Sequence, residues 1–412
     1  MSNTLITPSI IAQEALFQLE NNTVMGDKVH RQYRKEFVKI GDSVTIRRPV
    51  QFVVSDGAVR VNQDVIEPTT SITINQRKHV SWLFSTQDLT LTIEEYSERY
   101  IKPAMIQLAN RVDRDIALEG KNEFFNLVGT PGTTPGAFAD LAAVAQRMDE
   151  FAVPDDYNRC LVLNPAARWS MADGLGAVFN AEITGDTIRR GRLGEIANFN
   201  IYGDQNIVTH DNVVDMTGTL VNTAALVAQG PPSSALSSYA LAVDTTAANG
   251  TLTQGSVFTI AGVFSVNPVS KQTTGALQQF TLIADSVIAA NAGTLQIYPI
   301  INDGSVASIA GFQTVSVPGG LAALDNAAVT FVGVAGTPYV NNLGFHTNAL
   351  ALVTVPLELP DSATFKARAD WRGYSIRVVK DYDIDQDEEI IRLDMLYGVQ
   401  AIYPELGVRL AG

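Results

Sequence analysis

Cysteine and histidine are scarce in this chain of 412 residues. The one cysteine, Cys160, excludes an internal disulfide and a metal site made of several thiolates, and four histidines supply little material for a metal cluster. Such cysteine usage is typical of a protein that matures in a reducing compartment.

Charge is sparse as well. Charged residues make up 17% of the chain and apolar residues 46%, which excludes an intrinsically disordered chain and a charged helical rod. The 43 Asp and Glu residues outnumber the 29 Lys and Arg residues. A net charge of −14 repels phosphate and argues against a generally basic nucleic-acid binder, although local basic patches remain possible.

Patterns that direct a protein into or through a membrane are missing. The first basic residue is Lys28, so residues 1–10 lack the basic-then-apolar order of a signal peptide, and we expect no export. The apolar stretch 349–359 is interrupted by Pro356 and Glu358 and falls short of the roughly 18 residues that a membrane span needs. We therefore expect a soluble protein.

Motifs of the common catalytic and phosphate-binding classes are absent too. The chain contains no GxxxxGK[ST] loop, no GxGxxG after a strand, no HExxH and no GxSxG. The histidines lie in separate contexts, and the cysteine precedes an apolar run typical of a buried strand. We predict no catalytic, cofactor-binding or metal-binding residue and no enzyme activity, and we interpret as structural His30, His79, His210, His346 and Cys160.

What the sequence does contain is a sharp change in composition. Residues 219–345 include only five charged side chains. Runs rich in Val, Ile, Thr and Phe, such as 257–266 and 294–301, are separated there by Gly, Pro and Asn turns. A flexible linker would lack such spaced apolar runs. The pattern predicts an inserted small β-barrel domain.

The first third of the chain contains two different sequence patterns, one helical and one typical of strands. Residues 7–37 are predicted to be helical and carry a basic cluster, which is either a solvated helix face or a site for an acidic partner. This basic cluster consists of Lys28, Arg31, Arg34 and Lys35. Alternating and β-branched residues then predict strands and an extended hairpin at 43–48, 51–54, 70–75 and 79–85.

Two further helices follow. Thr92 and Glu95 have the spacing of a capping box, and apolar residues recur every three or four positions through 101–116, which predicts a long helix. Pro103 either begins its main segment or kinks it. A second helix is predicted over 135–151.

Short strands and tight turns complete the pattern. A strand at 160–163 leads to Asn164 as the cap of a short helix that begins at Pro165. Residues 191–202 indicate two strand segments around a turn in which Asn198 tolerates a left-handed conformation. Further strands are predicted at 349–355, 374–379 and 390–396.

The acidic run 381–389 is the most site-like feature. Its six carboxylates resemble the start of a calcium loop, but Gln386 stands where that loop needs glycine and Arg392 where it needs glutamate. An acidic turn between two strands is the simplest interpretation. The alternatives are a loosely held divalent ion or docking against a basic patch on another subunit, such as Arg189, Arg190 and Arg192.

The order of these parts resembles major capsid proteins of tailed bacteriophages with the Hong Kong 97-type fold. An amino-terminal helix, a hairpin region, a long helix, the turn at 161–165 and the hairpin at 191–202 occur in that order. The low-charge insertion and the terminal segment 392–405 narrow the resemblance to coat proteins of the phage P22 type. The resemblance covers nearly the whole chain by segment order.

The resemblance implies an α+β capsid protein without chemistry of its own. Its copies would form pentamers and hexamers in an icosahedral shell, assemble with a scaffolding protein, surround a portal protein at one vertex and enclose double-stranded DNA without sequence-specific binding. The implied location is the virion, after assembly in the bacterial cytoplasm, with no membrane partner. Scaffolding protein is then one candidate partner for the basic cluster.

The implied domains follow the segment order. They are a helical arm (1–40), an extended hairpin and peripheral domain with a spine helix (41–125), an axial domain in two parts (126–218 and 346–412) and the insertion (219–345). The competing interpretation is a secreted or surface β-rich binding protein, which only the Thr- and Ser-rich insertion favours. A hydrolase with a divergent site is a third class, for which the sequence offers no nucleophile and base.

Overall fold

The computed structural model divides into two compact units by its contacts. Unit 1 contains Met1–Val44, Ile72–Ile116 and Leu350–Gln400, and unit 2 contains Thr45–Ser71, Ala117–Ala349 and Ala401–Gly412. This division groups most of 346–412 with the long helix, whereas the sequence analysis placed it with 126–218. The structure describes residues 8–31, 33, 43–54, 56–58, 60, 62, 65–85, 97–176, 193–211, 216–222, 239–245, 250–363, 365–385 and 388–412.

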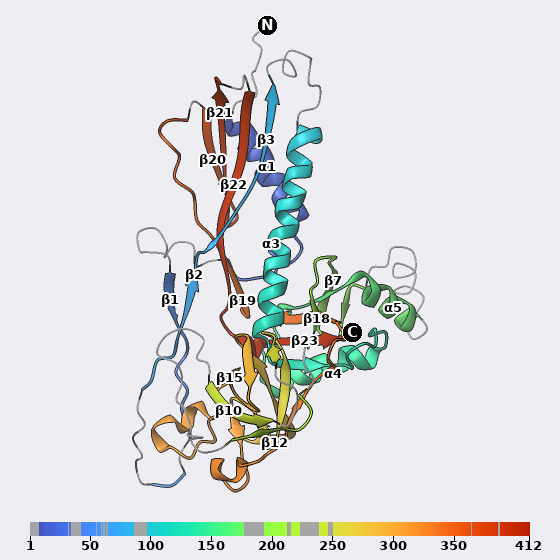
Figure 1. Ribbon diagram of the computed structural model, residues 1–412, viewed down its shortest axis with the longest axis vertical. Helices are drawn as coiled ribbons and strands as arrows, with labels where there is room; N and C mark the ends of the chain where they lie inside the picture. The colour runs from blue at the N-terminus through green and yellow to red at the C-terminus, as the bar shows by residue number, and fades with distance from the viewer. Residues whose placement is uncertain are drawn as a thin grey trace. The chain divides into compact units, whose positions relative to one another are not determined.

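Unit 1 is built on a five-stranded sheet with neighbours in the order β19-β22-β21-β20 and with β3 also paired to β22 (Figure 1). The pairings of β20 with β21, β21 with β22 and β22 with β3 are antiparallel. Long antiparallel strands joined by tight turns keep their register over many residues, so side chains far apart in sequence share one face. The strands are β3 (Gln76–Ser85), β19 (Leu350–Thr354), β20 (Phe365–Trp371), β21 (Tyr374–Asp383) and β22 (Glu388–Ala401).

Helix α1 (Pro8–Asn22) packs against β20 and β21 of this sheet. The helix ends well before the predicted boundary at residue 37, and Asp113 shows the reason. Its carboxylate accepts backbone N–H bonds from Val24 at 2.7 Å, Met25 at 3.1 Å and Gly26 at 3.0 Å. These bonds hold the chain in a turn, so Lys28 and Arg31 of the basic cluster lie beyond the helix; Arg34 and Lys35 lie outside the described residues.

The long helix is present as α3 (Lys102–Glu123), directly after a π-helical turn at Ser97–Ile101. Pro103 is its second residue, so the interpretation of Pro103 as a first-turn residue is confirmed and the kink is not. The apolar stripe predicted from the three- and four-residue spacing is buried, from Ile101 to Ile116. The proposed capping pair Thr92 and Glu95 lies outside the described residues.

Unit 2 contains a seven-stranded sheet in the order β4-β23-β18-β5-β7-β6, with β8 paired to β18. Helices α4 (Phe138–Glu150) and α5 (Pro165–Gly176) belong to the same unit, and the Asn164 side chain caps α5 by accepting the Ala167 N–H at 2.9 Å. The strands are β4 (Asn126–Val128), β5 (Arg159–Leu163), β6 (Glu195–Ile196), β7 (Phe199–Gly203), β8 (Thr209–His210), β18 (Tyr339–His346) and β23 (Gly407–Ala411).

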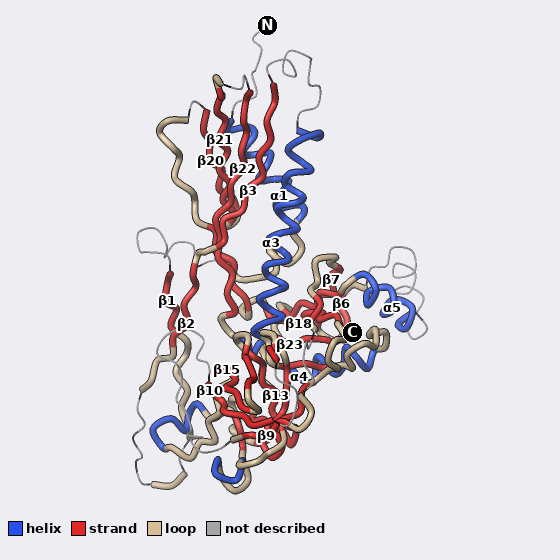
Figure 2. Tube along the Cα trace, in the orientation of Figure 1, coloured by secondary structure: helices blue, strands red, loops and turns tan. Residues whose placement is uncertain are grey.

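The low-charge stretch forms a second, nine-stranded sheet (Figure 2). Pairings run from β9 through β10, β15, β13 and β12 to β17, and a bridge between Leu220 in β9 and Ala328, the residue before β17, closes the ring into a barrel. The strands are β9 (Thr219–Val221), β10 (Tyr239–Thr245), β11 (Gly250–Leu252), β12 (Val257–Val266), β13 (Thr273–Leu282), β14 (Ser286–Ala289), β15 (Ala292–Tyr298), β16 (Val315–Ser316) and β17 (Val329–Phe331).

Alternation explains why this stretch forms a barrel with so little charge. In β10, buried Tyr239, Leu241 and Val243 alternate with exposed residues, and Phe258 and Phe280 complete the interior with no exposed surface. The inward positions of β10 are thus mainly apolar, although polar side chains such as Ser265, Gln278 and Thr281 are buried in β12 and β13. Whether the barrel folds without the rest of the chain stays a prediction.

The α+β class predicted from the sequence is confirmed, and several element boundaries are corrected. Residues 51–54 form no strand, because they pair with no neighbouring strand; β1 (Ser43–Arg47) instead pairs with β2 (Thr69–Thr73). The turn of the 191–202 hairpin is Ala197-Asn198, both left-handed, with φ of 52° and 63°. Gly191 and Arg192 lie outside the described residues.

Candidate functional site

The acidic run lies at the end of the β21–β22 hairpin, and only part of it is a turn. Tyr382 pairs with Glu389 and Asp383 with Glu388, so the strands extend into the run further than predicted. Asp383 accepts the backbone N–H of Asp385 at 3.0 Å, which closes the turn. Gln386 and Asp387 lie outside the described residues.

Among the described residues, the charge of this hairpin is only partly compensated. Lys380 forms an ion pair with Glu389, whereas Asp381, Asp385 and the apolar Ile384 beside them are exposed. Crowded carboxylates repel each other unless solvent or a cation relieves them. The candidate basic partners Arg189, Arg190 and Arg192 lie outside the described residues, so that pairing stays a prediction.

The described part of the basic cluster is already engaged inside unit 1. Arg31 pairs with Asp27 at 3.0 Å, and its guanidinium lies 5.0 Å from the centre of the Tyr374 ring. Burial and neighbouring acidic groups raise the pKa of Tyr374, so the ring stays neutral beneath the arginine. Arg31 therefore stabilises the turn after α1, in addition to any role in binding an acidic partner.

A charge cluster that the sequence analysis missed surrounds Asp394 on β22. The Asp394 side chain has no exposed surface, and its carboxylate meets Arg377 at 2.5 Å, Arg392 at 2.7 Å and Arg77 at 3.9 Å. Burial alone would raise the pKa of this carboxyl, but the arginine hydrogen bonds and charges outweigh burial and lower it. One carboxylate thus joins β3, β21 and β22.

The residues interpreted as structural are held in separate surroundings. Cys160 is buried in β5, and the His346 Nε2 lies 3.0 Å from Asp156 Oδ1. A serine and a histidine do meet, because His210 Nε2 lies 3.2 Å from Ser256 Oγ. Both are buried, and the Ser256 hydroxyl donates to the Thr253 carbonyl at 2.8 Å, so this pair has no open side for a substrate.

Arg409 on β23 connects distant segments of unit 2. It is fully buried, and its Nη1 donates to the carbonyls of Lys121 at 2.6 Å and Gly255 at 2.7 Å, while Nη2 lies 3.3 Å from Thr281 Oγ1. The α3 end, the barrel and the C-terminal strand therefore share one guanidinium. Burial lowers the pKa of Arg409 to about 10, partly offset by Tyr339 and Glu123.

Two carboxyl groups accompany this arginine, those of buried Glu123 and half-buried Glu119. Burial raises the pKa of Glu119 on α3, although the Ala401 N–H donates to it. Burial and then the charge of Glu119 raise the pKa of Glu123 as well, whereas Arg409 lowers it. One oxygen of Glu123, Oε2, has no hydrogen-bond partner. These two glutamates favour the protonated form in the folded chain.

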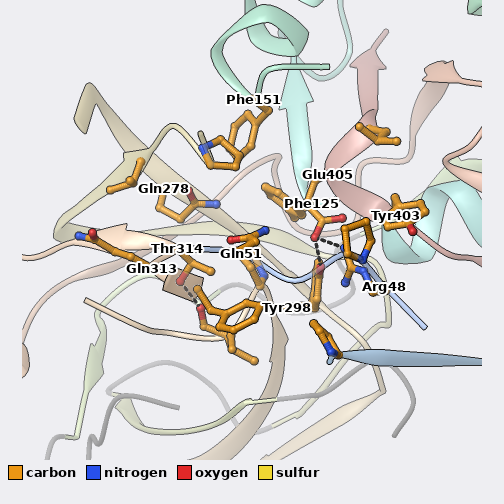
Figure 3. A pocket seen from close by; sticks show the side chains of 18 residues that line it. Arg48, Gln51, Phe125, Phe151, Gln278, Tyr298, Gln313, Thr314, Tyr403 and Glu405 are labelled. Atoms are coloured by element: carbon orange, nitrogen blue, oxygen red, sulfur yellow. Dashed lines mark hydrogen bonds and ion pairs between the residues drawn. The ribbon is translucent and has the colours of Figure 1, made fainter. Parts of the chain in front are cut away.

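A cavity of about 250 Å³ also lies in unit 2 (Figure 3). Inside it, Arg48 Nη2 lies 2.5 Å from Glu405 Oε1, and the Tyr298 hydroxyl donates to the same oxygen at 2.9 Å. Burial by itself lowers the pKa of Arg48, but Glu405 and Tyr298 raise it further than burial lowers it, so the guanidinium stays protonated. The aromatic side chains that line the cavity are Phe125, Phe151, Tyr298, Phe312 and Tyr403.

Within the ranges that the structure describes, no group of three or more His, Cys, Asp or Glu side chains could hold a metal ion. Among the same residues, no helix is both long and apolar enough to cross a membrane. Among the described residues, the features that remain are an exposed acidic hairpin, an interior arginine network and pockets that include this aromatic one.

Comparisons with known proteins bear on this arrangement. A family model described as "P22 coat protein - gene protein 5" matches residues 2–412. No curated protein sequence matches the chain. Solved structures with a similar course of the chain include one from Mycobacterium phage Che8, at 14% identity and a TM-score of 0.49, covering 94% of this chain and 90% of that one.

Two other solved structures are the capsids of Cyanophage P-SCSP1u and bacteriophage PhiM1. The first is 11% identical with a TM-score of 0.47 and covers 94% of this chain and 87% of that one. The second is 10% identical with a TM-score of 0.44 and covers 90% of this chain and 82% of that one. The assignment rests on the family match, which confirms the resemblance found in the order of segments. Because that match extends over residues 2–412, the chain belongs to the P22 coat protein family.

Proposed function

We propose that copies of this chain assemble as pentamers and hexamers into the icosahedral shell of a tailed double-stranded DNA bacteriophage. The observation that carries this proposal is the coat-protein family match over residues 2–412. It makes the chain a major capsid protein with a place in the virion, and it implies a shell of many copies. The alternative of a secreted or surface binding protein has no support from the comparisons.

The role is structural, with no reaction catalysed. In the described chain, His210 and Ser256 meet; both are buried, and the serine hydroxyl donates to the Thr253 carbonyl, as expected for groups that hold the fold together. Buried Arg409 and Asp394 each join several strands, which suits a subunit that must keep its shape under load from its neighbours. Mechanical cohesion is therefore the property that these interior sites serve.

The remaining partners belong to the same proposal. We expect a scaffolding protein during assembly in the host cytoplasm, a portal protein at one vertex and enclosed DNA that is not read by sequence. The net charge of −14 fits a container that must let its DNA enter and leave, because tight phosphate contacts would oppose both. The domain roles follow the resemblance, with α3 as the spine of the peripheral domain, the barrel as the insertion and no membrane contact.

Expression with and without the phage's own scaffolding protein tests this proposal. Electron microscopy should show uniform closed particles when both are present, and irregular shells, spirals or no particles when the coat protein is alone. Particles of the same size and yield under both conditions would remove scaffolding from the proposal. A coat protein that stays unassembled in both would contradict the shell itself.

A further inference from the structure

The sheet of unit 1 carries four arginines on one of its faces. Arg377 in β21 lies directly opposite Arg368 in β20 on one side and opposite Asp394 in β22 on the other. Side chains of directly opposed residues, and of residues two apart in a strand, point to the same face of an antiparallel sheet. The register therefore places four residues on one face of the neighbouring strands β3, β22, β21 and β20 (Figure 1), and we call them the arginine face: Arg77, Arg368, Arg377 and Arg392.

This face is open to water, whereas the opposite face of the sheet is packed into the core. Ile376 and Val378, which alternate with the arginines along β21, are buried. The side chains of Arg77, Arg392 and Arg368 are 51%, 37% and 39% exposed. A second molecule can therefore reach three of the four arginine side chains.

Positive charge exceeds negative charge on the arginine face. Among the described residues, ion pairs join its four arginines to two carboxylates, those of Asp394 and Asp370. Like charges directly opposite each other in a sheet are destabilising, and Arg368 and Arg377 form such a pair. In a chain with a net charge of −14, this surplus makes a local basic surface that fits an acidic partner.

A complementary acidic surface lies at the end of the β21–β22 hairpin. Residues 383–388, which we call the acidic tip, contain four carboxylates, and Asp385 among them is exposed. The nearest arginine of the arginine face in the same copy is Arg392, four residues or about 13 Å along β22 from Glu388. Its Nε donates at 2.7 Å to Asp394, which lies still further from the tip. The acidic tip and the arginine face of one copy therefore do not neutralise each other.

Apolar side chains accompany both charged surfaces. Ile384 at the acidic tip is 81% exposed. Leu83 and Ile390 lie opposite each other on the side of the sheet that carries the arginines, and they are 56% and 39% exposed. Protein interfaces combine apolar contacts with charged groups that fix the orientation, so the two surfaces match in both respects.

We propose that the arginine face binds the acidic tip of a second copy of this chain. The inference rests on the proposed assembly of many copies and names one contact between them. Arginine side chains bind carboxylates with two parallel hydrogen bonds, which fixes the geometry of such a contact. A contact between two different surfaces of identical copies closes into a ring when the rotation between copies allows it, and pentamers and hexamers are such rings.

Charge reversal on each surface, alone and together, tests this contact. Arg368→Glu alters an exposed ion pair and Asp385→Arg an exposed side chain, so both variants should stay folded. In cells that also express the scaffolding protein, each single variant should lower the yield of shells about fivefold, and the double variant should restore it to within about twofold of the unaltered chain. Arg111→Glu is the control and should leave the yield unchanged, because Arg111 lies on α3, is 48% exposed and already pairs with Asp115.

The outcomes separate this contact from the assembly itself. No shells from the unaltered chain would contradict the proposed function. Shells that form while Arg368→Glu changes nothing, or a double variant no better than the single ones, would overturn this inference alone. In the second case the arginine face would bind another polyanion, such as an acidic segment of the scaffolding protein or DNA phosphates. An equally large loss with Arg111→Glu would also overturn it, because reversal of any exposed arginine would then suffice.

A crosslink decides the proposal if Arg368→Glu does not fold. Shells of Arg368→Lys, which keeps the charge, are prepared from a mixture of isotopically labelled and unlabelled copies and treated with a carbodiimide, which joins an amine to a carboxylate in direct contact. Mass spectrometry should find the amine at position 368 joined to residues 383–388 of a copy with the other label. Crosslinks within one copy only, or to other residues only, would contradict the proposal.

Discussion

Asp394 contributes more to the stability of unit 1 than its position in the middle of a strand suggests. It has no exposed surface and accepts bonds from Arg377 and Arg392, so losing its charge would leave two arginines without their counterion. Breaking a buried ion pair by removing one partner costs about 3 kcal/mol or more. We predict that Asp394→Asn lowers the free energy of unfolding by about 3 kcal/mol in denaturant titration of the subunit.

Asp370 is the matched control on the same sheet. It pairs with Arg368 at 3.7 Å. The Arg368 side chain is 39% exposed and the Asp370 side chain 34%. Exposed pairs contribute about 0–1 kcal/mol, so Asp370→Asn should change stability by less than about 0.5 kcal/mol. Equal losses from the two variants would show that the arginines around Asp394 do not depend on its charge.

Glu123 makes the stability of unit 2 depend on pH. Its pKa is raised in the folded chain, so folding retains a proton that the unfolded chain releases. The contribution is therefore fully present below the unfolded pKa of about 4.5 and is lost as pH rises through the higher folded pKa. We predict that Glu123→Gln, the neutral isostere, flattens this decline and is more stable than the natural chain at about pH 8 by roughly 2 kcal/mol.

Thermal unfolding followed across the pH range from about 5 to 9 measures that decline. Glu195→Gln is the control, because Glu195 is exposed on β6 and its carboxyl meets water in both states. Two results would show that the retained proton is bound by another group. One is a control whose stability declines as little with pH as that of Glu123→Gln, and the other is a Glu123→Gln variant whose stability declines as steeply as that of the natural chain.

The sequence could reveal residues whose role is local, but not those whose partners are distant. Asn164 and Asn198 were predicted correctly, because a helix cap and a left-handed turn depend on the next few residues. Asp394 alternates in the sequence with the apolar residues Leu393 and Met395, and nothing local indicates that it is buried too. Its burial depends on Arg77 and Arg377, which reach it only through strand pairing, and Arg409 is hidden from sequence reasoning in the same way.

At the scale of elements, the β21–β22 hairpin exposes part of its negative charge. Asp385 is exposed beside Ile384, and only the Lys380–Glu389 pair relieves the crowding within the described chain. We predict that replacing Asp385 and Asp387 by Asn leaves the free subunit folded and weakens the shell. Each contact contributes no more than ~1 kcal/mol, but the lattice repeats it.

Denaturant titration of subunits beside assembled shells distinguishes the possibilities. Asp361→Asn, in an exposed pair with Lys366, serves as a control in the same unit. Equal losses in subunits and shells would place the acidic run inside one subunit. No loss in either would make it a solvated turn.

The barrel provides the second prediction at this scale. Its ring of strands and its own apolar interior contain most of residues 219–331. We predict that the fragment 219–345 unfolds cooperatively on its own, because its core is filled by its own side chains. An amide NMR spectrum typical of random coil would contradict this, and the Arg409 bonds to Gly255 and Thr281 would then be essential to the barrel.

Elements were easier to predict where they have their own periodicity. The apolar stripe of α3 and the run 257–266 were found from spacing alone, because each fills its own face of a core. The end of α1 was missed, because Asp113 stops it from 87 or more residues away. Residues 51–54 have strand-like composition but form no strand, and Gln51 among them lines the cavity, which no local pattern indicates.

For the whole molecule, the central claim is that this 44.4 kDa chain is the repeating subunit of a closed shell. The family match over residues 2–412 carries it, and the buried arginine networks, which hold each subunit in one shape, are consistent with it.

Electron cryomicroscopy of particles purified from cells that express the chain with its scaffolding protein tests this claim most directly. The account predicts closed icosahedral shells in which this chain occupies both pentamers and hexamers, with the acidic hairpin at a contact between subunits. Particles built from another protein, or a chain that stays monomeric or forms only small oligomers in every preparation, would contradict it.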